Sequence, residues 1–186
     1  MEETAKISYR IDAQDHIVFV NDEWSNFALA NNGAHLVKES VLHTSLWRFI
    51  TDLTTEYLYR QILRRVRTGI EMRFTLRCDA PETKRLLEML ITPMAGGEVR
   101  FTTVPVWVEG RISQRILQNG LPHEDYMIVV CSWCNKLEVA ENIWSEVEEA
   151  AQRLGIFHVE IIPKLTHGIC GDCYKKMSLY INPVSS

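Results

Sequence analysis

The chain lacks the long apolar runs and the excess of basic charge that define several large classes of protein. No uninterrupted apolar run approaches the roughly 18 residues of a membrane helix, and the N-terminus from Met1 to Lys6 has no apolar segment typical of a signal peptide. The 20 Lys and Arg residues against 24 Asp and Glu residues give a formal net charge of −4, which provides no general attraction to nucleic acid or anionic membranes. We therefore expect a cytoplasmic protein whose partner is neither a membrane nor a nucleic acid.

Sequence signatures of catalysis are also missing. The chain has no Ser-His-Asp order, no glycine-rich phosphate-binding loop and no kinase signature. We expect no catalytic residues, so any output is made through contacts with other molecules.

Cysteine is scarce, but its distribution is informative. Four of the five cysteines form two C-x2-C pairs, Cys131 with Cys134 and Cys170 with Cys173, and Cys78 is left over. Thiols stay reduced in the cytoplasm, so the odd number and the close pairing favour metal ligation over disulfides. Because two such pairs can complete a tetrahedral shell of thiolates, the sequence predicts a zinc ion bound by these four residues.

The segments that carry the two pairs favour the same interpretation. Residues 126–130 are a strand candidate leading into Cys131, and residues 171–177 can begin a helix directly after Cys170. A helix N-terminus favours thiolate, and a knuckle followed by ligands at a helix start is how treble-clef zinc sites are built. His167 is an alternative ligand or a residue that supports one, because four cysteines already fill the shell and leave no open position for catalysis.

Three other interpretations stay open. The four cysteines can be buried reduced thiols that pack as small apolar side chains. Cys131 and Cys134 can be the working pair of a thiol-disulfide oxidoreductase, which leaves the second pair unexplained. The protein can also be a zinc-dependent nucleic-acid binder that uses Arg60 and Arg64, although the acidic chain favours a solvated helix face for these arginines.

The length and composition allow two small domains. The chain has 186 residues, of which 46% are hydrophobic and 24% charged, enough for two apolar cores. Gly110, Asn119-Gly120 and Pro122 predict a linker over residues 109–125, between domains at 5–108 and 126–180. Hydrophobic periodicity predicts strands over 7–12, 16–20, 72–78, 85–92, 98–108 and 126–130, and helices after Asn21, within 45–69, over 141–154 and after Cys170.

Residues 5–108 combine this order of strands and helices with several short motifs. Ile17-Val18-Phe19-Val20-Asn21 precedes the first predicted helix, and Ser45-Leu46-Trp47 begins the next helical segment. Together these features resemble the PAS family of sensory domains. The resemblance implies an α+β fold, in which a five-stranded antiparallel sheet carries helices on one face, and it implies a homodimer. Cys-x-Trp-Cys followed by Thr166-His167-Gly168-Ile169-Cys170 resembles the tails of poorly characterised bacterial PAS signalling proteins.

The same resemblance implies a pocket for an unknown small-molecule ligand. Its expected lining residues, which a core without a ligand would equally require, are Phe19, Trp24, Phe27, Trp47, Met72 and Phe74. His35 and His43 lie where haem-binding PAS proteins carry a ligand, but a lone histidine is usually a surface or hydrogen-bonded residue, so we do not expect haem. Flavin is not expected either, because the cysteine motif of light-sensing PAS domains is absent from residues 21–70.

These observations predict a stand-alone bacterial sensory or regulatory adaptor. In this hypothesis a PAS-like pocket is coupled to a structural or redox-labile zinc site, and the output is contact with a protein partner.

Overall fold

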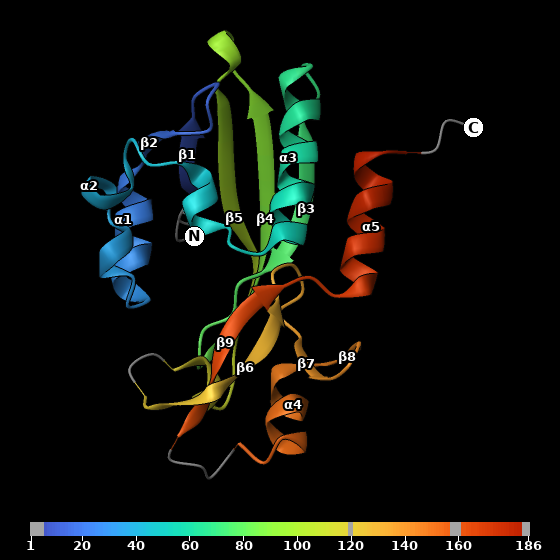
Figure 1. The fold of residues 1–186 in the computed structure, drawn as a ribbon. Coiled ribbons are helices and arrows are strands. Elements are labelled where there is room, and N and C mark those ends of the chain that lie inside the picture. Colours follow the sequence, from blue (N-terminus) through green and yellow to red (C-terminus); the bar gives the residue numbers. More distant parts are fainter. Residues whose placement is uncertain (1–5, 119–120, 157–160, 184–186) are drawn as a thin grey trace. The chain divides into compact units, whose positions relative to one another are not determined.

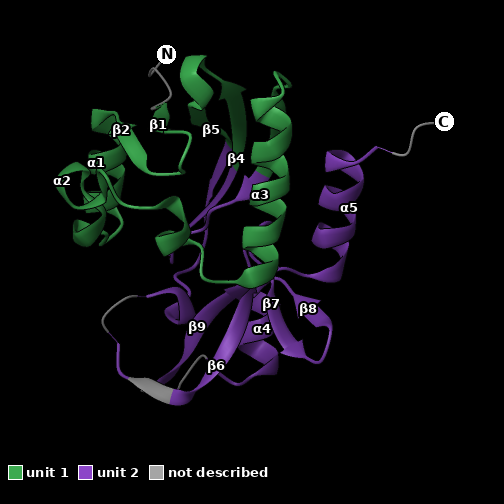
Figure 2. Ribbon diagram, turned by 45° about the horizontal axis from the view of Figure 1, so that its top comes forward, with its two compact units in different colours: residues 1–75, 87–106 green, residues 76–86, 107–186 purple. Residues whose placement is uncertain are grey.

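The computed structural model describes residues 6–118, 121–156 and 161–183, which form helices and strands in two compact units (Figures 1 and 2). The first unit comprises Met1–Thr75 and Leu87–Val106, and the second comprises Leu76–Leu86 and Trp107–Ser186. The prediction of an α+β fold is confirmed.

A five-stranded antiparallel sheet, with the strand order β2-β1-β5-β4-β3, is the framework of the first unit. Its strands are β1 (Ile7–Ile11), β2 (Ile17–Val20), β3 (Met72–Arg77), β4 (Thr83–Pro93) and β5 (Val99–Gly110). The helical segments are α1 (Asp22–Ala30), η1 (Ala34–Leu36), α2 (Lys38–Val41), η2 (Leu46–Phe49), α3 (Leu53–Arg67) and η3 (Ala95–Gly97). The ends of β3 and β5 and the start of β4 belong to the second unit, so these three strands are shared between the units.

Side-chain caps set the starts of the two longer helices in this unit. The Asn21 side chain accepts a hydrogen bond from the amide of Trp24, and the Asp52 carboxylate accepts one from the amide of Thr55 at 2.7 Å. Each cap satisfies an amide that has no partner within its helix. Among the described residues, no helix is both long and apolar enough to cross a lipid bilayer.

Alternation along the strands separates a core face of this sheet from an outer face. The Tyr9 and Phe101 rings, on neighbouring strands, stack with centroids 4.4 Å apart, and the Trp24 ring of α1 meets Tyr9 edge-on at 5.3 Å. Because successive side chains of a strand point to opposite faces, Ser8 and Arg10 lie on the face away from this aromatic cluster.

The second unit contains a four-stranded sheet with the order β8-β7-β6-β9. Its strands are β6 (His123–Cys131), β7 (Leu137–Ala140), β8 (Ile143–Ser145) and β9 (Ile162–Gly168), and its helices are η4 (Arg115–Leu117), α4 (Val147–Arg153) and α5 (Gly171–Ile181). β9 runs parallel to β6, whereas the β6–β7 and β7–β8 pairs are antiparallel. Val130, Leu137, Val147 and Ile162 belong to the apolar core that joins this sheet to α4.

The predicted helix over residues 141–154 is wrong in its N-terminal part. α4 begins only at Val147, and the residues before it form the β7–β8 hairpin. Asn142 has a φ of 58°, a left-handed conformation that asparagine tolerates better than most residues, so the chain turns there. Trp144 consequently belongs to β8, with Glu138 of β7 as its partner.

Several described residues of the predicted linker over 109–125 pack within the second unit. β5 extends to Gly110, and the side chain of Arg111 is only 5% exposed. Gln114 and Ile116 are buried, and Ile116 belongs to the apolar core of the unit. The compact units divide the chain after Thr75, Leu86 and Val106, and the predicted domain limits of 5–108 and 126–180 stay a prediction.

Candidate metal centre

A tight turn after β6 positions the first cysteine pair. Cys131 is the last residue of β6, and its amide donates to the carbonyl of Lys136 at 2.8 Å. The amide of Asn135 donates back to the carbonyl of Cys131 at 2.9 Å, with Asn135 at a φ of 61°. These contacts fold residues 131–136 into a knuckle, so that Cys134 returns toward Cys131 before β7 begins.

Parallel pairing of β9 with β6 brings the second pair to the first. Cys131 stands opposite Gly168 in the register, and the amide of Ser132 donates to the carbonyl of Gly168 at 2.8 Å. Cys170 then caps α5, its sulfur accepting from the amide of Cys173 at 3.5 Å. The long insertion between the pairs therefore does not keep them apart.

The four sulfurs form one compact cluster. The Sγ atoms of Cys131, Cys134, Cys170 and Cys173 all lie within 4.8 Å of one another, and those of Cys134 and Cys170 are 3.8 Å apart. A tetrahedron of thiolates with metal–sulfur bonds of about 2.3 Å has edges of roughly 3.8 Å, so the cluster has the size of such a site. All four cysteines are free thiols. The prediction that the two pairs come together is confirmed.

Hydrogen bonds within the cluster make the Cys131 thiol easy to ionise and hold the protons on the thiols of Cys134 and Cys173. Cys131 has a pKa well below its usual range, chiefly because the thiols of Cys134 and Cys173 donate to its sulfur, and the amide of Cys170 also donates to it at 3.4 Å. The same contact with Cys131 raises the pKa of Cys134 to about 12, and the pKa of Cys173 is also raised. Several thiols so close together cannot all ionise alone, whereas a divalent cation would replace their protons.

The cluster is buried on one side and open on the other. Cys131 and Cys170 are buried, whereas Cys134 and Cys173 are half-buried. A cleft of about 540 Å³ adjoins the sulfurs, and its lining includes Lys136, Asn142, Ile143, Trp144 and Asp172. This cleft provides a path by which a metal ion can reach the thiols. Sequence reasoning missed it because it depends on the unpredicted β7–β8 hairpin.

His167 and Cys78 lie outside the group of converging sulfurs. His167 is exposed on β9, opposite Val130 of β6, and the group of neighbouring ligand atoms consists of the four cysteines. Cys78 follows β3, and burial raises the pKa of its thiol. Four ligands are therefore available without the histidine.

An ion-pair cluster beside the knuckle was not predicted. Asp79, whose side chain is fully buried, accepts from Arg77 Nε at 2.9 Å and from Arg111 Nη1 at 3.2 Å. Glu148 of α4 lies 3.5 Å from Arg111 and 2.7 Å from Lys84. Hydrogen bonding to Asp79 raises the pKa of Arg77. The cluster thus ties residues 77–84 to the rest of the second unit.

One backbone hydrogen bond joins this region directly to the cysteine knuckle. The amide of Arg77, at the end of β3, donates to the carbonyl of Trp133 at 2.8 Å. Trp133 lies between Cys131 and Cys134 in the sequence and is buried. A change in the knuckle would therefore act on the end of β3 within the same unit.

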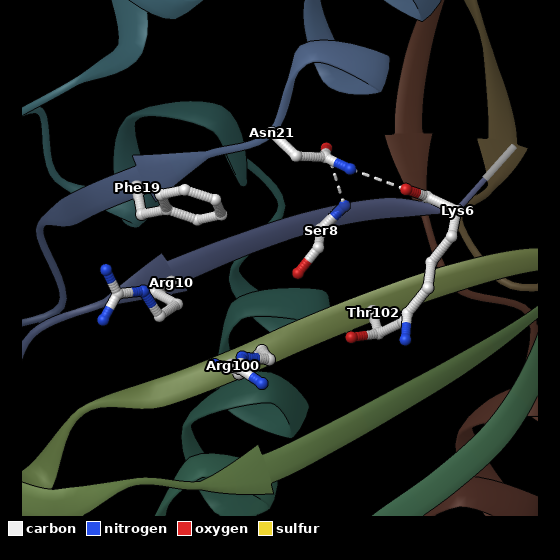
Figure 3. A pocket seen from close by; sticks show the side chains of 7 residues that line it. All are labelled: Lys6, Ser8, Arg10, Phe19, Asn21, Arg100 and Thr102. Carbon is white, nitrogen blue, oxygen red and sulfur yellow. Dashed lines mark hydrogen bonds between the residues drawn. The ribbon is translucent and has the colours of Figure 1, made fainter.

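The residues predicted to line a PAS-type pocket all lie in the first unit, but in different surroundings. Met72 and Phe74 are buried in β3, Trp24 and Phe27 are half-buried on α1, and Trp47 is half-buried in η2. Phe19 lines a groove with side chains of the outer sheet face (Figure 3). A single pocket formed by all six residues stays a prediction.

Two arginines of α3 are engaged inside the first unit, and one of them, Arg60, was considered for nucleic-acid binding. The Arg60 guanidinium lies 3.9 Å from the centre of the Trp47 ring and pairs with Glu56 at 2.7 Å. Arg67 pairs with Asp15 at 2.7 Å. These contacts give both arginines a structural role.

The fold and the site thus define an α+β protein with a four-cysteine cluster that could hold a metal ion. No protein-family model matches the chain, and a search of curated proteins finds no significant match.

Proposed function

We propose that Cys131, Cys134, Cys170 and Cys173 bind one zinc ion as thiolates and that this ion organises the second unit. The observation that carries the proposal is the convergence of four sulfurs from a knuckle and a helix start within 4.8 Å of one another. An all-sulfur tetrahedral set suits zinc, and a shell filled by protein ligands has no open position for substrate. The ion would therefore have a structural or regulatory role.

The ligand arrangement favours a metal site over a thioredoxin-like dithiol. A dithiol of that kind uses a helix N-terminus to stabilise its thiolate. Here Cys131 ends β6 and Cys134 lies in the turn before β7, and the helix start carries Cys170 and Cys173 instead. Two cooperating pairs also give all four cysteines the same role.

We further propose a regulatory protein in which the zinc module is coupled to a PAS-like sensory unit. The hydrogen bond from Arg77 to Trp133 supports the coupling, because β3 and β4 are shared between the cysteine-bearing unit and the five-stranded sheet. A ligand that shifts these strands, or a change at the thiolates, would then alter a surface offered to a protein partner or to a second copy of the chain.

Removal of zinc is expected to loosen the end of β3 far more than the β1–β2 hairpin. The amides of Arg77 and Cys78, which donate to Trp133 and Arg85, should exchange with deuterium at least about tenfold faster after the metal is chelated, since their acceptors lose a fixed position. The amides of β2, which belong to the first unit, should change much less. Hydrogen exchange read by NMR, with and without a chelator, measures both.

Two results would contradict the proposal. Unchanged exchange at Arg77 and Cys78 after complete metal loss would exclude the coupling of the zinc module to the PAS-like unit. That result would not contradict the proposal that the four cysteines bind zinc. Reduction of insulin disulfides by the reduced protein, lost in Cys131→Ser, would instead support the dithiol function.

A further inference from the structure

A groove on the outer face of the five-stranded sheet gathers positive charge from separate strands. It has a volume of about 480 Å³ and is lined by Lys6, Ser8, Arg10, Phe19, Asn21, Arg100 and Thr102 (Figure 3). All of these residues belong to the first unit. Among the residues that the structure describes, the lining contains three cations and no carboxylate, in a chain with a formal net charge of −4.

The register of the strands arranges these side chains in two rows. In the first row, Arg10 of β1 stands directly opposite Phe19 of β2 on one side and opposite Arg100 of β5 on the other. In the second row Ser8 stands opposite Thr102. Because Tyr9 and Phe101 alternate with these residues and point to the core face, the groove lies on the face away from the aromatic cluster.

The pairing of Arg10 with Arg100 conflicts with the usual rule for strand partners. Like charges directly opposite each other destabilise an antiparallel pair. The Glu98 carboxylate forms an ion pair with Arg10 at 2.9 Å and so offsets the charge of Arg10. The Arg10 guanidinium also lies 5.0 Å from the centre of the Phe19 ring. Arg100 is exposed, and within the described ranges no carboxylate pairs with it. The Arg100 guanidinium can therefore contact solvent or a bound anion.

We infer that this groove binds a small organic anion through a phosphate or carboxylate group. Arg100 and Arg10 supply the charged donors for that group, and arginine is suited to both because its planar fork can donate two parallel hydrogen bonds. Phe19 offers an apolar surface beside them, and Lys6 supplies a further cation in the same groove. The volume falls within the roughly 300–1,000 Å³ of small-molecule sites. This site is independent of the zinc proposal, since it uses none of the cysteines.

Titration with inorganic phosphate and, separately, with succinate tests the inference. At constant ionic strength, saturable NMR shifts are expected at the amides of Ser8, Arg10, Arg100 and Thr102, with the more effective anion identifying the preferred group. Arg100→Gln should weaken this binding at least about tenfold, which corresponds to the loss of one charge-assisted contact. Arg73→Gln is the matched control, because Arg73 pairs with Glu88 at 2.6 Å and does not line the groove.

Thermal unfolding of the same variants gives a second readout. Without added anion, Arg100→Gln should raise the Tm by about 1–3 °C, because the like-charged partner is removed. Phosphate or succinate should raise the Tm of the original protein but not that of Arg100→Gln. Shifts no larger than those caused by chloride, or equal binding by Arg100→Gln, would overturn the inference. Binding of a ten-nucleotide single strand without binding of either small anion would also overturn it.

Discussion

Replacing Cys170 and Cys173 together with serine is expected to abolish zinc binding and unfold the second unit at 25 °C. Both sulfurs belong to the converging cluster, so the double substitution removes two of its four metal ligands, whereas serine at position 170 can still cap α5. Structural zinc sites contribute about 10–16 kcal/mol in small zinc domains, which is as large as or larger than the roughly 5–15 kcal/mol by which a typical domain is stable. Loss of dispersed NMR signals from β6 to α5 would measure the unfolding.

Cys78→Ser is the matched control for this experiment, because Cys78 is the fifth cysteine and lies outside the cluster. This variant should keep its metal and its dispersed spectrum. A doubly substituted protein that unfolds at the same denaturant concentration as the original would show that the cluster contributes nothing to the stability of the unit.

Replacing Asp79 with alanine is expected to lower the free energy of unfolding by about 3–5 kcal/mol. The Asp79 side chain is fully buried, and its removal would leave the 5% exposed guanidinium of Arg111 and the 18% exposed one of Arg77 without their shared carboxylate. Glu146 and Glu148 would remain 3.5 Å from Arg77 and Arg111, but both carboxylates are partly exposed, so the buried charge would be only weakly compensated. A poorly compensated buried charge costs far more than the loss of a surface pair. Urea unfolding followed by circular dichroism measures the change.

Glu149→Gln provides the comparison for Asp79→Ala. Glu149 pairs with Arg153 at 2.6 Å, yet both side chains are about half exposed, at 52% and 51%. This substitution should cost less than about 0.5 kcal/mol, because solvent screens the pair. Equal effects of the two substitutions would contradict the assigned role of the buried cluster.

Local sequence patterns predicted the elements whose signals are local. The alternation through Met72, Phe74 and Leu76 predicted β3, and the apolar stripe of Leu58, Ile62 and Val66 predicted α3. The C-x2-C spacings predicted that the four sulfurs would meet. The signals for β3 and α3 are carried by neighbouring residues alone. The meeting of the two cysteine pairs additionally requires the pairing of β9 with β6, which the local spacings do not indicate.

The missed features depend on contacts between distant segments. The spacing of Trp144, Val147 and Ala151 fits a helix, but pairing with β7 recruits Trp144 into β8. β9 was not predicted because Pro163 interrupts its pattern and its partner strand β6 is far away in the sequence. The Asp79–Arg111 pair joins residues 32 positions apart, and nothing in either local sequence indicates the other.

The metal content of protein purified without chelator tests the central claim most directly. Elemental analysis is expected to find one zinc ion per chain, retained in Cys78→Ser and lost when Cys170 and Cys173 are both replaced. The zinc site would be contradicted by folded protein that is free of metal and in which the thiols of all four clustered cysteines react freely. That result would favour the interpretation of Cys131 and Cys134 as the working dithiol of an oxidoreductase.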